Sequence, residues 1–240
     1  MEGVISSGSV LNMEEYFSSV QAELEKKESR REEIVSKARE LQSCKRKIES
    51  LLNKIQTTAD DSKTAEAVVK SILDELKSFS SLWKEVDRCI GTDSREKYRG
   101  IWASSLSTFT TAAVMAHWLK TQQLVDKEEA AKMIGVGPAN ECKIDLDLED
   151  YLLGVCSVPS ELSRLCVNYV AHGKYDMLED ISKFVTGLFS SFRLLNLKNS
   201  NLRRNFDRIK YAVRKIEEVI YDVRVRNLLN KTETRERERE

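Results

Sequence analysis

A short segment near the middle of the chain combines cations and aromatic rings. Within eight residues lie Arg95, Lys97, Tyr98, Arg99 and Trp102. Aromatic faces stack on unpaired bases while cations hold the phosphates, which is the usual chemistry of single-strand binding. The segment is therefore a candidate nucleic-acid site. Trp102 also falls on the apolar period of its helix, so core packing is the favoured interpretation for that ring.

A second candidate is acidic. Between Glu141 and Glu161 six acids face one base, Lys143, and the local net charge is −5. The acids are Glu141, Asp145, Asp147, Glu149, Asp150 and Glu161. Such hard oxygen ligands can hold Mg²⁺ or Mn²⁺ for phosphodiester hydrolysis. The favoured interpretation is simpler: acids at the positive end of a helix dipole and on solvated faces.

A third candidate is basic. From Arg193 to Arg226 ten bases outnumber four acids, which leaves a local net charge of +6. A helix of this kind suits a phosphate-binding surface. It suits equally well a pairing with the acidic segment of a neighbouring helix or subunit, because exposed charge on helices is common. The sequence leaves these two interpretations open.

Other catalytic patterns are missing from the sequence. There is no G-x-S-x-G elbow and no Walker loop. The two histidines, His117 and His172, lie 55 positions apart, which does not favour a histidine-based zinc site. The five cysteines form no CxxC pair, and the N-terminus lacks the pattern of a signal peptide. We expect buried, reduced thiols in a cytoplasmic protein.

The composition predicts the class of fold. Apolar residues make up 41% of the 240 positions and charged residues 32%, while only two prolines and nine glycines occur. These values favour a helical protein with a genuine core. The formal net charge is zero, so nucleic-acid binding requires a local patch. No stretch approaches the roughly 20 apolar residues that span a bilayer, and no membrane partner is expected.

Heptad spacing of apolar residues predicts the long elements. One helix runs from Met13 to near Thr57, and a second run from Ala65 to Ile90 stops at Gly91. Two such helices joined by a short turn pack antiparallel. A helix over 94–121 is poor in charge on every face and should be surrounded by other helices or another subunit. Further helices are expected over 126–135, over 147–172 with a kink at Pro159, over 181–195, and from 201 onward.

These elements predict an all-α fold: a single-domain bundle of six or seven helices. The helical domain should occupy residues 13–228. Residues 1–12 are expected to be a flexible N-terminus, and residues 229–240 a disordered charged tail, because neither segment has an apolar face to bury.

Several runs of the sequence resemble the translin family. They read DLEDYLLGV, SELSRLCVN, GKY, SFRLLNLKNSNLRR and KIEEVIYDVRVR. The resemblance extends from Tyr16 to Arg226 and is closest from Asp145 onward. It implies an all-helical fold, assembly into a hollow octamer, and binding of single-stranded RNA and DNA inside the shell. It also implies partnership with translin-associated factor X in an endoribonuclease that removes passenger strands during RNA silencing and trims tRNA precursors.

The resemblance also implies roles for particular residues. The family's main nucleic-acid segment falls on Lys97, Tyr98, Arg99 and Trp102, and an earlier basic stretch leaves only Lys63 and Lys70. In the complex, acids of the partner hold Mg²⁺. Their positions fall here on Thr108, Thr111 and Ser157, and only Glu161 is acidic. Hydroxyls bring no negative charge to a hard cation, so neither a metal site nor a cofactor is expected on this chain.

Three functional hypotheses follow. The leading one is a non-catalytic, single-strand-binding subunit of the translin-type endoribonuclease. The alternative is a structural scaffold that stabilises the catalytic partner without binding nucleic acid itself. The third, ranked last, is an autonomous Mg²⁺-dependent ribonuclease built around Glu149 and Glu161.

Overall fold

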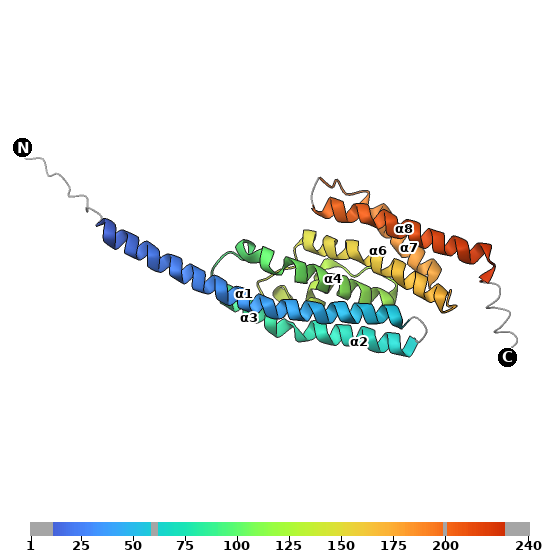
Figure 1. Cartoon of the computed structure of the whole chain (residues 1–240), viewed down its shortest axis with the longest axis horizontal. Helices are drawn as coiled ribbons and strands as arrows, with labels where there is room; N and C mark the ends of the chain where they lie inside the picture. Colours follow the sequence, from blue (N-terminus) through green and yellow to red (C-terminus); the bar gives the residue numbers. More distant parts are fainter. Residues whose placement is uncertain (1–11, 59–61, 199–200, 229–240) are drawn as a thin grey trace, which may run out of the picture.

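The chain folds into an elongated bundle of α-helices, shown in the computed structural model of Figure 1. The structure describes residues 12–58, 62–198 and 201–228. Its α-helices are α1 (Met13–Thr57), α2 (Ser62–Ser78), α3 (Ser80–Ile90), α4 (Arg99–Thr121), α5 (Lys127–Ile134), α6 (Leu148–Ala171), α7 (Leu178–Phe192) and α8 (Asn201–Val225), with short 3₁₀ turns η1 (Arg95–Tyr98) and η2 (Pro138–Asn140). Within those ranges there is no strand, and the predicted all-α fold is confirmed.

The first helix agrees with the heptad prediction at both ends. The side chain of Asn12 accepts a hydrogen bond from the Glu14 N–H at 3.2 Å and caps the N-terminus. Residues 13–33 contain no buried side chain, and α1 extends beyond the rest of the bundle (Figure 1). Burial begins at Ile34, where α1 reaches α3 and α4. The segments predicted to be flexible, 1–12 and 229–240, lie outside the described residues apart from Asn12.

The second heptad run is two helices rather than one. The break lies at Phe79, whose N–H donates to the Leu76 carbonyl at 3.2 Å in a tight 3₁₀ turn. Phe79 is buried, and the backbone of Gly135 packs so closely that a Cβ there would lie 2.7 Å from Ser80 Cα. Counting α2 and α3 as one run, the described residues form seven α-helical segments, in agreement with the six or seven predicted.

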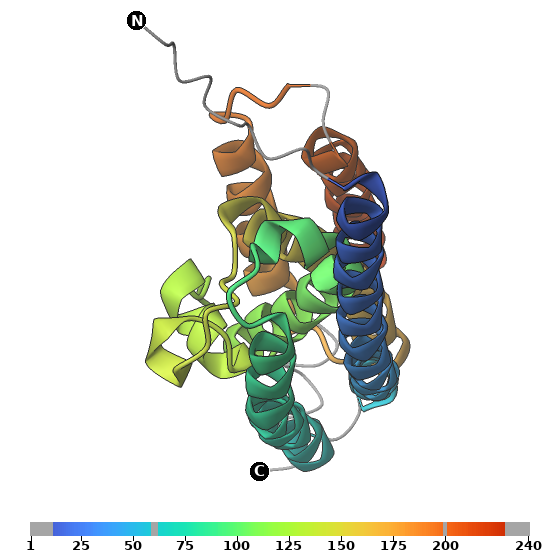
Figure 2. The same ribbon diagram turned by 90° about the vertical axis from the view of Figure 1, so that its left-hand side faces the viewer.

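Helix α4 forms the centre of the bundle. It packs against α1 and α2 on one side and α6 on the other, while α7 and α8 cover α6 (Figures 1 and 2). Residues 109–116 of α4 are all buried. The prediction that this charge-poor helix is surrounded by others is therefore confirmed within one chain.

The closest approach in the centre is between α4 and α6 at Gly154. A Cβ on this glycine would lie 2.5 Å from the Cβ of Thr110 and 3.0 Å from the Ser107 carbonyl oxygen. The Thr111 hydroxyl of α4 donates to the Gly154 backbone carbonyl of α6 at 3.0 Å and links the two helices. Only glycine permits this spacing, because any side chain would force the helices apart.

Two predicted helix features are also confirmed. The carboxylate of Asp126 accepts from the Glu129 N–H at 2.8 Å and begins α5, which ends at Gly135 with φ of 89°. Helix α6 passes through Pro159 as one helix, as the apolar ladder predicted. No helix among the described residues is long and apolar enough to cross a membrane.

The five cysteines are free thiols, as the odd and scattered set predicted. Cys142, Cys156 and Cys166 are buried, while Cys44 and Cys89 are partly accessible. Burial raises the pKa of Cys156 to about 12 and that of Cys166 to about 11, because the thiolate is poorly solvated in the core. These thiols pack as small apolar side chains.

The glycine contact gives a test of the fold. We expect Gly154→Ala to destabilise the protein by about 2 kcal/mol, because overpacking pushes α4 and α6 apart. The matched control is Gly187→Ala in α7, where a Cβ meets nothing within 4 Å. That change should be neutral or stabilising by about 0.5 kcal/mol. Thermal unfolding followed by circular dichroism measures both, and equal melting temperatures for the two variants would contradict the packing described.

Candidate nucleic-acid interface

The predicted cation–aromatic segment lies at the junction of η1 and α4. Tyr98 is 4% exposed and Trp102 3% exposed, so both rings belong to the core. The Tyr98 hydroxyl donates to Asp93 at 3.1 Å. The favoured interpretation of Trp102 as a packing residue is confirmed. Since neither ring presents a face to solvent in this chain, contact with a strand at this segment depends on its cations.

Arg99 is engaged by acids of α6. Its Nε lies 3.1 Å from Asp150 Oδ2 and its Nη2 lies 2.9 Å from Asp150 Oδ1, with Asp147 Oδ2 at 3.4 Å. The hydrogen bond that Arg99 donates to the Asp150 carboxylate raises the pKa of the Arg99 guanidinium. The Asp150 carboxylate is buried, so the guanidinium compensates a charge that would otherwise be uncompensated in the core. Sequence reasoning missed this pair, whose members are 51 positions apart.

Lys97 is the exposed member of the predicted site. Its Nζ lies 5.2 Å from the centroid of the Tyr98 ring, and it forms no ion pair within the described ranges. The structure thus brings Lys97, Tyr98, Arg99 and Trp102 together along one turn and a half of helix. Lys97 is exposed, whereas Arg99 is partly exposed and already paired with Asp150 and Asp147.

The three hydroxyl positions that the family resemblance predicts to correspond to acids of a partner are bonded to the backbone. Thr108 donates to the Ser104 carbonyl at 3.2 Å, Ser157 to the Leu153 carbonyl at 3.3 Å, and Thr111 to the Gly154 carbonyl. Thr108 and Ser157 line one hollow of about 460 Å³ between α4, α6 and α8, which Lys45 and Asp150 also line. Its one carboxylate, Asp150, is already paired with Arg99, and Lys45 adds a positive charge, so the hollow is unfavourable for a cation.

Glu161 is the remaining acid of that set, and its carboxylate is bonded to other side chains outside the hollow. Its carboxylate accepts from Gln56 Nε2 at 3.0 Å and from Arg164 Nη1 at 3.1 Å. Gln56 is buried, and its backbone carbonyl accepts from the Asn168 side-chain amide at 2.8 Å. The hydrogen bonds of Gln56 with Glu161 and Asn168 thus join the end of α1 to α6. Over 12–58, 62–198 and 201–228, no group of three or more His, Cys, Asp or Glu residues is placed to hold a metal ion.

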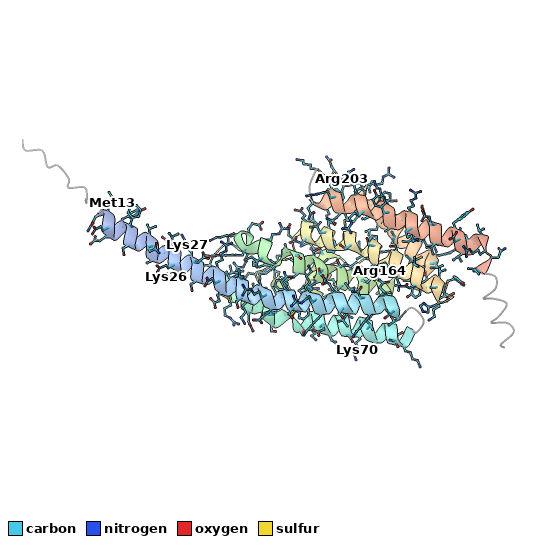
Figure 3. All side chains as sticks on the ribbon, in the orientation of Figure 1. Met13, Lys26, Lys27, Lys70, Arg164 and Arg203 are labelled. Atoms are coloured by element: carbon cyan, nitrogen blue, oxygen red, sulfur yellow. The ribbon has the colours of Figure 1, made fainter. Side chains whose placement is uncertain are left out.

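The two bases of the earlier basic stretch, Lys63 and Lys70, lie at one end of the bundle. Lys63 and Lys70 of α2 line a cavity of about 820 Å³ together with Lys120 and Lys174. Glu66 and Asp176 line the same cavity and reduce its positive charge. Figure 3 shows Lys70 on the outer side of α2.

The basic segment predicted over 193–226 coincides largely with α8. Its apolar residues face α6 and α7, and its cations lie on the outer surface, as Figure 3 shows for Arg203. Tyr211 is exposed among these cations, and sequence reasoning did not single it out. The signal was present, because Tyr211 lies off the apolar period of α8 and one turn from both Arg208 and Lys215.

The Arg99–Asp150 pair predicts a structural role for Arg99. We expect Arg99→Ala to destabilise the protein by about 3 kcal/mol, because it leaves a buried carboxylate unpaired. Lys97→Ala is the matched control and should change stability by less than about 0.5 kcal/mol. Adding Asp150→Asn to Arg99→Ala should recover part of the loss. Urea unfolding measures all three, and an additive double mutant would show that the two side chains are not coupled.

Comparison with known proteins supports the resemblance of the sequence. The model of the Translin family matches residues 29–227. Translin of Homo sapiens is 44% identical over 131 residues, which cover 55% of this chain and 58% of that protein. Translin of Gallus gallus is 43% identical over 136 residues, which cover 57% of this chain and 59% of that protein. The matched part is thus less than two thirds of these relatives' length.

More distant matches extend over a larger share of the chain. Translin-associated protein X of Mus musculus is 24% identical over 189 residues, which cover 71% of this chain and 64% of that protein. A solved structure titled "Crystal structure of apo-NeC3PO" superposes with a TM-score of 0.59 at 19% identity, covering 89% of this chain and 98% of that one. That likeness shows the shared fold. With the family model matching most of its length, the chain belongs to the translin family.

Proposed function

We propose that this chain is a non-catalytic nucleic-acid-binding subunit of a translin-type endoribonuclease. It would bind single-stranded RNA and DNA and act with a partner that resembles translin-associated factor X. Membership of the translin family and the similarity to translin-associated protein X support this assignment. The complex would promote RNA silencing by passenger-strand removal and process tRNA precursors in the cytoplasm, with the nucleus as a second compartment.

The observation that carries the non-catalytic part is the chemistry of the four residues predicted to correspond to the partner's metal-binding acids. Thr108, Thr111 and Ser157 supply neutral hydroxyls, and the hollow beside two of them is lined by Lys45 and by Asp150, which is paired with Arg99. Glu161 is committed to Gln56 and Arg164. A divalent cation prefers several carboxylate oxygens. Mg²⁺ would therefore be held by the partner subunit, whose acids would supply the chemistry.

Self-assembly into a hollow octamer is part of the proposal. The projecting half of α1 exposes Met13, Phe17 and Leu24, which follow the heptad spacing. An isolated helix seldom keeps such a stripe in water, and a neighbouring subunit would cover it.

A structural scaffold is the second candidate function. It is favoured by the burial of Tyr98 and Trp102 and by the engagement of Arg99 with Asp150. A scaffold would stabilise the partner while the partner both binds and cleaves the strand.

Binding across a salt series separates the two functions. We expect a fluorescently labelled single-stranded RNA to bind the purified full-length chain, with affinity that falls steeply as salt rises, because bound phosphates release counterions. Fluorescence anisotropy at several salt concentrations measures the slope. A double-stranded RNA of equal length is the control and should bind more weakly, since its bases are not free to stack. Absence of binding at low salt would favour the scaffold.

A cleavage assay tests the assignment of chemistry to the partner. The pure chain should release no Mg²⁺- or Mn²⁺-dependent products from single-stranded RNA, whereas its complex with a translin-associated-factor-X partner should do so. EDTA should abolish the products of the complex. Metal-dependent cleavage by the pure chain, lost in Glu161→Gln, would instead support an autonomous ribonuclease. That variant keeps the size of the side chain and one acceptor oxygen, removes the charge and replaces the second oxygen with an NH₂ donor.

A further inference from the structure

We infer that the outer face of α8 around Tyr211 is a stacking platform for an unpaired nucleic-acid strand. The inference rests on the proposed binding function and locates its site away from the segment that the sequence favoured. It assigns a base-stacking role to Tyr211 and phosphate-contacting roles to the cations around it.

The geometry of the face suits stacking. Tyr211 is 64% exposed, in contrast to the buried rings of Tyr98 and Trp102. Lys210 Nζ lies 5.0 Å from the centroid of the Tyr211 ring and covers one of its faces. A base would stack on the opposite face, which a ring exposed to this degree presents to solvent.

The charges around the ring leave a positive surface. Between Arg203 and Lys215 six bases accompany a single acid, Asp207. That acid pairs with Arg203 at 3.4 Å, and Arg214 pairs with Glu218 at 3.2 Å. Across the described segments, no ion pair involves the remaining bases of this face, which are Arg204, Arg208, Lys210 and Lys215.

Helical periodicity places these groups in one line. Arg204, Arg208, Tyr211 and Lys215 follow at intervals of four, three and four residues, so all point to the same side of α8. All four side chains are exposed. The line is about 16 Å long at 1.5 Å per residue, enough for phosphates on either side of a stacked base.

The same helix supplies a matched control. Tyr221 is 67% exposed, but it shares a hollow with two acids, Glu179 and Glu217, and two bases, Lys183 and Arg224. Balanced charges of this kind give no net attraction for phosphates. The two tyrosines therefore have similar exposure but different electrostatic settings, and only Tyr211 is expected to contact the strand.

The experiment compares variants of the full chain in binding to labelled oligouridylate and oligothymidylate of about 20 nucleotides, longer than the platform. Tyr211→Ala should weaken binding about tenfold, the loss expected for one stacked base. Tyr211→Phe should stay within about twofold, because the ring is retained. Tyr221→Ala should bind like the wild type. Circular dichroism should show equal melting temperatures, since both tyrosines are exposed.

The salt dependence of binding tests the phosphate-contacting role of the cations. In the double variant Arg204→Gln/Arg208→Gln, the slope of log affinity against log salt should become shallower by about 1.4, which corresponds to two phosphate contacts on a single strand. The control is Arg226→Gln, which removes a base just beyond the end of α8 and away from Tyr211. This variant should leave the slope within about 0.7 of the wild-type value.

The outcomes separate this inference from the proposed function. If the wild type binds and Tyr211→Ala binds equally well, the platform is wrong and the binding function stands. If neither the chain nor its complex with the partner binds either oligonucleotide, the binding function itself fails. If the arginine variants bind normally but no longer assemble with the partner on size-exclusion chromatography, the face is a protein-docking surface and the inference is overturned.

Discussion

The contact between α4 and α6 at Gly154 is the constraint on which the rest of the structure depends. The two backbones approach closely enough for the Thr111 hydroxyl to reach the Gly154 carbonyl at 3.0 Å. This approach requires a helix of small residues, and α4 supplies serines, threonines and alanines at the contact. Helices α1 and α2 pack on one side of α4. Helix α6 packs on the other side of α4, and α7 and α8 pack on α6.

The same contact determines what the centre of the molecule can do. It brings Thr108 and Ser157 to one hollow and places Asp150 beside Arg99. The buried carboxylate is compensated by a guanidinium rather than by a metal, and the hydroxyls donate to the backbone of their own helices. The charges of the centre are therefore internally balanced, an arrangement that stabilises the fold and provides no cluster of acids for a cation.

Charge is balanced over the chain but separated in space. Acids near the start of α6 hold Arg99, whereas the cations of α8 lie on the outer surface. A net charge of zero therefore coexists with a local surface able to attract phosphates. The projecting half of α1 adds an exposed apolar stripe that is separate from that surface (Figure 1).

Periodicity by itself determined the helices, because a heptad stripe repeats within a few residues and needs no distant partner to be recognised. It placed the ends of α1 and the continuous α6, and the charge-poor stretch indicated the central α4. It missed the break at Phe79, beside which Gly135, more than 50 positions away, packs against Ser80. Local spacing placed Trp102 on the core side of its helix and Tyr211 off the apolar period of α8, but it did not show that Tyr98 is buried. Burial of Tyr98 and the pairing of Arg99 with Asp150 were decided by tertiary structure, since each depends on which face of a helix meets another.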